Sequence, residues 1–325
     1  MKRNVLYFLI LIGVCINGFS AFINPVEGSR ELVSVFGGAR MTSDLNSLEY
    51  SLGLGISTGE KTGIPVRCMA AGYVEKVIRN HPVYGTGIFI NHGDGIQSRY
   101  TNLFKLKGDF MKIFDAINIE FESGYLELQF EPREFEVKEG EIIGYSGVSG
   151  RSGVPYSHVE IVDLNRDMSL NPVKYIDMTL KDSGYTISFK KIRINMEEYD
   201  FREGIQYPYT GKRPSVDILI ENGSEKEEFK FAVQKIEVRF DDEEVLIIDM
   251  DEIPLDQLDT AMRVYGEGTN HQTFWYRLTT PWMSKPIVMN EIRNMDVFSD
   301  KIKVDITVTD VFGTVENTVF WLKRR

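Results

Sequence analysis

The chain has 325 residues, of which 42% are apolar, and this length and composition are typical of a folded protein with about two domains. Its 37 basic and 48 acidic residues give a net charge of −11. This charge argues against nucleic acid as a partner, because binding to phosphates requires clustered Lys and Arg.

The first twenty residues have the layout of a secretory signal. Two basic residues precede an apolar run over residues 5–16, and small residues stand before Ala21. We therefore expect a signal peptide over residues 1–20 and an exported protein, periplasmic or associated with the cell envelope. The apolar run is shorter than the roughly 20 residues that span a bilayer. Contact with a membrane is expected only through an uncleaved signal or a lipid on Cys15.

The next part of the chain, residues 21–180, is expected to form a compact antiparallel β domain. Residues 63–74 and 84–95 are short runs of β-forming residues separated by glycine turns. Residues 137–153 are rich in glycine and lead into an expected strand at residues 156–162. Cys68 lies among apolar residues and is expected to be buried and unreactive.

An apolar-rich insertion is expected at about residues 107–136. Polar and apolar residues alternate over residues 125–130, which predicts a strand. The insertion is then either an extra hairpin that covers the core or an exposed aromatic surface for a partner. The residues alone leave both readings open.

The last part, residues 185–325, has the pattern of a β-sandwich. Apolar and polar residues alternate over residues 192–196, 236–240 and 302–309, and residues 315–322 predict the last strand. The pattern is immunoglobulin-like, although the paired cysteines and core tryptophan of antibody domains are missing. A short helix is expected over residues 255–265, and no other substantial helix. The fold class is therefore all-β.

Five blocks between about residues 51 and 172 resemble the lysostaphin-type (LytM) zinc endopeptidases, which are exported peptidoglycan hydrolases. The resemblance implies a lysostaphin-like antiparallel β domain, followed here by the sandwich. In family order the blocks are "Gly-x-Pro-Val … Gly-x-Val" at residues 63–74, "Tyr-Gly … His-Gly-Asp-Gly" at 84–95, "Tyr-x-His-Leu" at 100–103, "Val-x-x-Gly-x-x-Ile-Gly" at 137–144, and "His-x-His-x-Glu" at 156–160.

The resemblance also implies where the metal ligands should stand. In the family, zinc is held by a "His-x-x-x-Asp" pair and by the second His of "His-x-His", and these positions are Ser51, Gly55 and His158 here. The two histidines that assist catalysis fall on Asn102 and Tyr156. A catalytic zinc needs about three protein ligands, and His158 is the only family ligand retained. We therefore expect a degenerate member with no catalytic residue, no metal and no cofactor.

The expected function is that of a non-catalytic cell-envelope protein that binds, acts as a scaffold or regulates a hydrolase. Ser51, Asn102, Tyr156 and His158 are expected to line a residual groove. The expected partner is a peptidoglycan peptide or an envelope protein such as a wall hydrolase.

Two other functions stay open at this stage. An active metallo-endopeptidase could cut peptidoglycan cross-links with a rebuilt site, in which Asp or Glu residues from elsewhere join His158. Alternatively, the sandwich over residues 185–325 could be the functional part, an adhesion or assembly module for which the first domain is a spacer.

Overall fold

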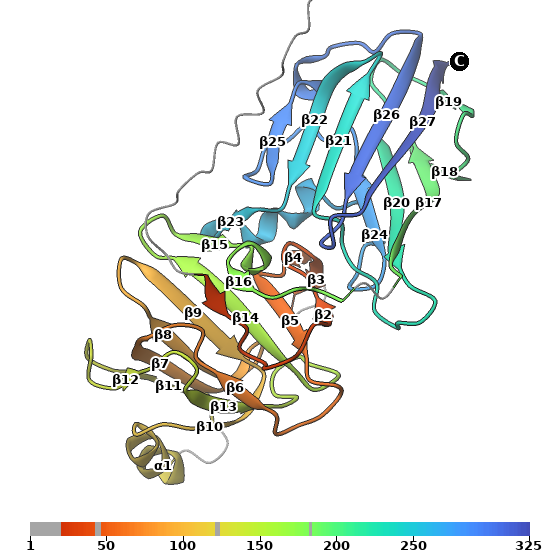
Figure 1. The fold of residues 1–325 in the computed structure, drawn as a ribbon. Coiled ribbons are helices and arrows are strands. Elements are labelled where there is room, and N and C mark those ends of the chain that lie inside the picture. The colour runs from red at the N-terminus through yellow and green to blue at the C-terminus, as the bar shows by residue number, and fades with distance from the viewer. Residues whose placement is uncertain (1–20, 43–46, 121–123, 182–183) are drawn as a thin grey trace, which may run out of the picture.

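The computed structural model describes residues 21–42, 47–120, 124–181 and 184–325 (Figure 1). The signal peptide expected over residues 1–20, and Cys15 within it, lie outside the described residues. Within the described ranges, no helix has the length and apolar character needed to cross a membrane.

The first part of the chain, red to green in Figure 1, is built almost entirely of short strands. Its elements are β1 (Phe22–Ile23), β2 (Leu32–Ser34), β3 (Ala39–Met41), β4 (Leu48–Tyr50), β5 (Gly53–Ser57), β6 (Pro65–Arg67), β7 (Gly72–His81), β8 (Gly85–Asn91), β9 (Ile96–Thr101), β10 (Leu103–Leu106), α1 (Met111–Glu120), β11 (Leu126–Gln129), β12 (Glu136–Val137), β13 (Ile142–Ser146), β14 (Tyr156–Asp163), β15 (Met168–Leu170), the 3-10 helix η1 (Pro172–Lys174) and β16 (Ile176–Asp177).

The largest sheet places β14 at its centre. The strand order is β11-β7-β8-β9-β14-β15-β23; β5 also pairs with β14, and β2 pairs with β5. Six consecutive residues of β14, from Ser157 to Val162, are buried. A continuous buried run is the pattern of a strand that is covered on both faces. Side chains on β14 are therefore held by the interior of this domain.

The second part, green to blue in Figure 1, forms two further sheets. Their strand orders are β18-β17-β20-β24 and β19-β27-β26-β21-β22-β25. The elements are β17 (Thr186–Ile194), β18 (Glu197–Asp200), β19 (Gln206–Tyr209), β20 (Val216–Gly223), β21 (Lys235–Phe240), β22 (Glu243–Asp249), β23 (Glu252–Pro254), the 3-10 helix η2 (Leu255–Arg263), β24 (Phe274–Arg277), β25 (Ile287–Asn290), the 3-10 helix η3 (Ile292–Asn294), β26 (Lys301–Thr309) and β27 (Val315–Arg324).

The alternation of apolar and polar residues correctly predicted strands in this second part. Every second residue of β26 is buried, starting at Ile302, and all four of its isoleucines and valines are at most 3% exposed. The all-β fold class is confirmed. The specifically immunoglobulin-like character of the sandwich stays a prediction.

The insertion differs from its predicted form, because it contains a helix. Residues 111–120 form α1, and only then does β11 pair antiparallel with β7. Phe110, which directly precedes α1, and Phe114 within it are 1% and 5% exposed, and their i, i+4 spacing places both side chains against the core. The expectation of no second helix was therefore wrong.

Two local expectations can be compared directly with the structure. The helix expected over residues 255–265 is the 3-10 helix η2, which is interrupted at Gln257 by a φ of −118°. Cys68 is buried, and burial raises the pKa of its thiol to about 12, so the thiolate is disfavoured at neutral pH.

The two parts of the chain are joined by more than a linker. β23 comes from the second part, yet it pairs with β15 and so extends the largest sheet of the first part (Figure 1). The Tyr265 hydroxyl donates to the Gly37 carbonyl at 2.6 Å, and Gln234 Nε2 donates to the Phe36 carbonyl at 3.1 Å. The segment that follows β2 is therefore held by both parts.

Candidate ligand-binding groove

His158 lies where three strands meet. On β14 it is directly opposite Gly55 of β5 on one side and Thr101 of β9 on the other. Residues directly opposite each other in antiparallel strands point to the same face of the sheet. His158, Thr101 and any side chain at position 55 therefore share one face.

The space in front of Gly55 is filled by the chain itself. A Cβ atom at position 55 would lie 2.5 Å from Ser34 Oγ and 2.7 Å from Val33 Cγ2, both in β2. These separations are shorter than a nonbonded carbon contact of about 3.5 Å. The residue type is therefore constrained by packing, and an Asp side chain has no room here.

Ser51 is held by its backbone. Its N–H donates to the Gly38 carbonyl at 2.7 Å, and its own carbonyl accepts from the Gly37 N–H at 2.8 Å. Its hydroxyl lies 3.5 Å from the Gly53 carbonyl. The two backbone bonds tie the turn at residues 37–38 to the segment between β4 and β5.

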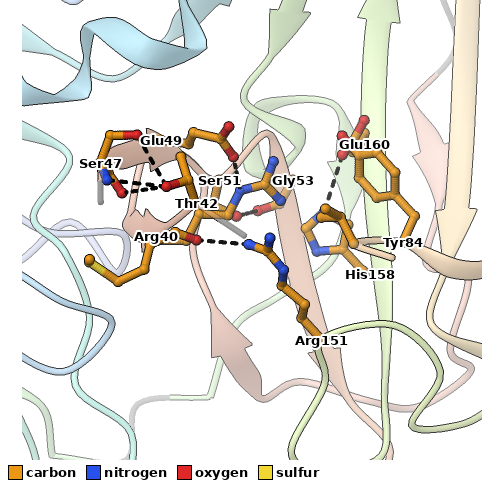
Figure 2. A network of polar contacts seen from close by, with 12 residues as sticks. Arg40, Thr42, Ser47, Glu49, Ser51, Gly53, Tyr84, Arg151, His158 and Glu160 are labelled. Atoms are coloured by element: carbon orange, nitrogen blue, oxygen red, sulfur yellow. Dashed lines mark hydrogen bonds and ion pairs between the residues drawn. The ribbon is translucent and has the colours of Figure 1, made fainter. Parts of the chain in front are cut away.

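The imidazole of His158 belongs to a buried polar network (Figure 2). Its Nε2 atom lies 3.3 Å from Glu160 Oε1, and the other carboxylate oxygen lies 3.4 Å from Arg99 Nη1. Glu160 is fully buried. Burial by itself would raise the pKa of Glu160, but the bond from His158 and the charges of Arg99 and Arg40 outweigh burial and lower it. Glu160 is therefore an anion inside the domain.

The charge of Glu160 also acts on a nearby phenol. Its negative charge, followed by burial, raises the pKa of Tyr84. Figure 2 shows the Tyr84 ring beside the Glu160 carboxylate. Tyr84 therefore stays a neutral hydroxyl at neutral pH.

The residues present do not fit the zinc ion that the family resemblance implies. Among the described residues, no group of three or more His, Cys, Asp or Glu is arranged to hold a metal ion. His158 is bonded to Glu160, while position 55 is a glycine packed against β2. A zinc ion needs about three protein ligands in a tetrahedral arrangement.

Beside this network the structure has a groove, a cavity of about 810 Å³. Ser51, Asn102, Tyr156 and His158 all line it, so the structure brings the four predicted site residues together. Asn102 has a φ of +62° and its N–H donates to the Tyr84 carbonyl at 3.0 Å. Burial raises the pKa of Tyr156, so its hydroxyl is neutral at the groove wall.

The groove has walls that the sequence analysis did not identify. One group comes from the first part of the chain and consists of two arginines. The other group comes from two segments of the second part and is largely aromatic. These residues are Arg40, Arg151, Phe229, Lys230, Phe231, His271 and Phe274. No local signal could have identified the second group, because it is more than 70 residues away from His158 along the chain.

The loop that carries Arg151 is fixed by its glycine and serine residues. The Ser149 hydroxyl donates to the Leu103 carbonyl at 2.9 Å and accepts from the Thr86 N–H at 2.9 Å. Gly150 has a φ of +75°, and a Cβ atom there would lie 2.4 Å from the Val83 carbonyl oxygen. Only glycine satisfies both conditions without strain. The glycine-rich stretch thus places the next side chain at the groove.

The cationic side chains that line the groove differ in their partners. Arg40 pairs with Glu49 at 3.5 Å, and Lys230 pairs with Glu221 at 2.5 Å. Arg151 donates from Nη1 to a backbone carbonyl of β3 at 2.8 Å, and no carboxylate in the described part of the chain pairs with it. Arg151 is therefore the uncompensated positive charge of the groove.

No protein-family model matches the chain. No curated protein matches it either.

Several solved structures are similar to part of the chain. A zinc-containing peptidase from Vibrio cholerae is 25% identical with a TM-score of 0.34, over 47% of this chain and 39% of its own. A chain of the SpoIIQ–SpoIIIAH pore forming complex is 21% identical with a TM-score of 0.34, over 50% of this chain and 94% of its own. The catalytic domain of lysostaphin from Staphylococcus simulans is 18% identical with a TM-score of 0.30, over 42% of this chain and 81% of its own.

The similar solved structures include lysostaphin and other zinc or M23 peptidases. The chain spans less than half of the Vibrio cholerae protein. All three TM-scores are 0.34 or lower, so they carry no argument about activity or partners.

Proposed function

We propose that this protein is an exported, non-catalytic component of the cell envelope whose groove binds a peptide. One observation carries this proposal: β2 fills the space that a metal ligand at position 55 would need, while a groove of about 810 Å³ stays open beside it. A volume of this size is within the range of small-ligand sites, roughly 300–1,000 Å³. In this proposal the site does not bind a catalytic metal, and the groove beside it serves as a binding surface.

The groove has the composition of a binding site. An amide (Asn102), a phenol (Tyr156) and an imidazole (His158) supply a few polar groups, and the aromatic residues of the second part form an apolar wall. Polar groups that fix orientation and apolar groups that supply contact area are the usual combination in ligand sites. We propose that a peptidoglycan peptide, or a segment of an envelope protein such as a wall hydrolase, occupies this groove.

Binding of soluble wall peptides to the mature protein tests this function, with calorimetry as the readout. We expect Asn102→Ala and Tyr156→Ala to weaken binding about tenfold each, because each removes a polar or aromatic contact. Ser157→Ala is the matched control, since Ser157 lies on the same strand but points to the opposite face. Failure of wall peptides and of purified wall hydrolases to bind would contradict the proposal.

An active metallo-endopeptidase with a rebuilt site is the alternative, and elemental analysis of the protein purified without chelators separates the two. About one zinc per chain, with cleavage of cross-links that a chelator abolishes, would establish the enzyme. Our proposal predicts neither.

A further inference from the structure

Three cationic side chains line the groove, Arg40, Arg151 and Lys230, together with one carboxylate, Glu228. The chain carries a net charge of −11, and the side chain of Arg151 at the groove has one backbone carbonyl as its polar partner among the described residues. An arginine guanidinium has five N–H donors in a planar fork that matches a carboxylate with two parallel hydrogen bonds. One carbonyl uses only part of that capacity.

A second, independent feature of the same wall is a polar group without a partner. Thr101 is 0% exposed and lines the groove, and its Oγ1 atom has no hydrogen-bond partner in the described structure. Thr101 faces the same side of the sheet as His158, because the two are directly opposite on β9 and β14. A buried hydroxyl without a partner costs free energy unless a ligand completes it.

From these two features we infer that the groove contains a carboxylate subsite, and that it takes the free carboxyl terminus of a short peptide. Arg151 binds the carboxylate, and the Thr101 hydroxyl donates to a carbonyl of the same peptide. This inference rests on the proposed function and specifies its ligand. A chain terminus is favoured over an acidic side chain of a larger protein because a groove of about 810 Å³ accommodates a small ligand.

The loop geometry gives Arg151 a fixed position before the ligand arrives. The Ser149 hydroxyl forms hydrogen bonds with the backbone of Leu103 and Thr86, and Gly150 packs against the backbone at Val83. The backbone that carries Arg151 therefore does not need to be ordered on binding. Preorganisation of this kind reduces the entropic cost of binding. Arg151 is therefore a specificity-determining residue for the terminus of the peptide.

The test compares two forms of one wall pentapeptide, with a free carboxyl terminus or a C-terminal amide, by calorimetry on the mature protein. We expect the free acid to bind roughly tenfold to a hundredfold more tightly, as for a charge-assisted hydrogen bond. Arg151→Gln should remove this difference. Arg202→Gln, the control at an exposed arginine outside the groove, should retain it.

Each result has a distinct meaning. Equal binding of the two forms to the unaltered protein would overturn the carboxylate subsite and leave the peptide-binding function in place. A third peptide, amidated but with an added internal Glu, should bind like the amide; if it binds like the free acid, the chain-terminal assignment is wrong. No binding of any form would overturn the subsite together with the wall-peptide function.

Thr101→Val provides a second variant that does not depend on Arg151. It removes the unpartnered hydroxyl and keeps the shape of the side chain, so the urea midpoint should be unchanged or slightly higher. Binding of both peptide forms should weaken roughly threefold to tenfold. Unchanged binding would remove Thr101 from the site, and a lower midpoint would show that its hydroxyl is already satisfied by the protein.

Discussion

Glu160 is a fully buried carboxylate in the first part of the chain. It lies between His158 and Arg99. We expect Glu160→Gln to lower the free energy of unfolding by about 2 kcal/mol at pH 7, because the partly buried charge of Arg99 loses its counter-ion. Urea denaturation measures the change. Glu49→Gln, which breaks a partly exposed ion pair with Arg40, should cost less than about 1 kcal/mol.

The effect of Glu160 should depend on pH in one direction. Its pKa is lower in the folded protein than in the unfolded chain, so its contribution is fully present above the unfolded pKa of about 4.3 and is lost as the pH falls through the folded pKa. The difference between the native protein and Glu160→Gln should therefore narrow from pH 7 toward about pH 3. A constant difference would show that the charge of Glu160 is not the stabilising feature.

Gly150 is the residue that sets the position of Arg151. Gly150→Ala should destabilise the protein by about 2–4 kcal/mol, because it combines a positive φ with an overlap against the Val83 carbonyl. Gly313→Ala is the control. Gly313 has a φ of +83°, but an added Cβ atom meets nothing within 4 Å, so we expect this substitution to destabilise the protein by only about 1–2 kcal/mol. Equal urea midpoints for the two variants would refute the packing argument.

At the scale of elements, β2 determines what the β5–β14 pair can bind. Ser51→His combined with Gly55→Asp restores both replaced ligand types. We nevertheless expect this variant to bind no more zinc than the native protein. Its free energy of unfolding should fall by about 3 kcal/mol or more, since the new carboxylate meets Val33 and Ser34 in a buried position. Elemental analysis and urea denaturation measure the two outcomes.

The control for this pair of substitutions is Gly124→Asp. An added Cβ atom at Gly124 meets nothing within 4 Å, so the free energy of unfolding should change by no more than about 0.5 kcal/mol. A stable double variant that holds one zinc per chain would mean that β2 leaves the site easily.

At the scale of the whole molecule, the groove depends on how the two parts are joined. The Tyr265 hydroxyl donates to the Gly37 carbonyl across the junction, and the Tyr209 hydroxyl donates to the Ser299 carbonyl within the second part, both at 2.6 Å. Tyr265→Phe and Tyr209→Phe should each cost about 1 kcal/mol. Only Tyr265→Phe should speed hydrogen exchange in residues 32–42, where the turn at Gly37 loses its partner.

Equal exchange in residues 32–42 for both tyrosine variants would show that the junction does not hold this segment.

The contacts between the two parts also affect whether the second part can fold and function alone. A fragment of residues 185–325 would keep β23 but lose its partner β15, and would expose the edge of that strand. If the groove is the functional site, such a fragment retains the aromatic wall and lacks Arg151, Thr101 and His158.

Much of the fold was predictable from local pattern, and the exceptions have physical reasons. β26 and β27 lie where residues alternate between apolar and polar, since every second side chain of a half-buried strand meets the core. The insertion was misjudged because its aromatic residues satisfy both the strand and the helix period over a short window. The helix is stabilised by the packing of Phe110 and Phe114 against the core, which the local pattern does not show.

The sequence by itself determined that a serine stands at position 51 and a glycine at position 55, where the family resemblance implies metal ligands, because residue identity is a local property. The family resemblance implied that Ser51, Asn102, Tyr156 and His158 line one groove, and all four line the cavity in the structure. Only the tertiary structure decided that β2 fills the space at Gly55 and that the second part closes the groove. Both features arise from contacts between segments distant along the chain, which no local pattern encodes.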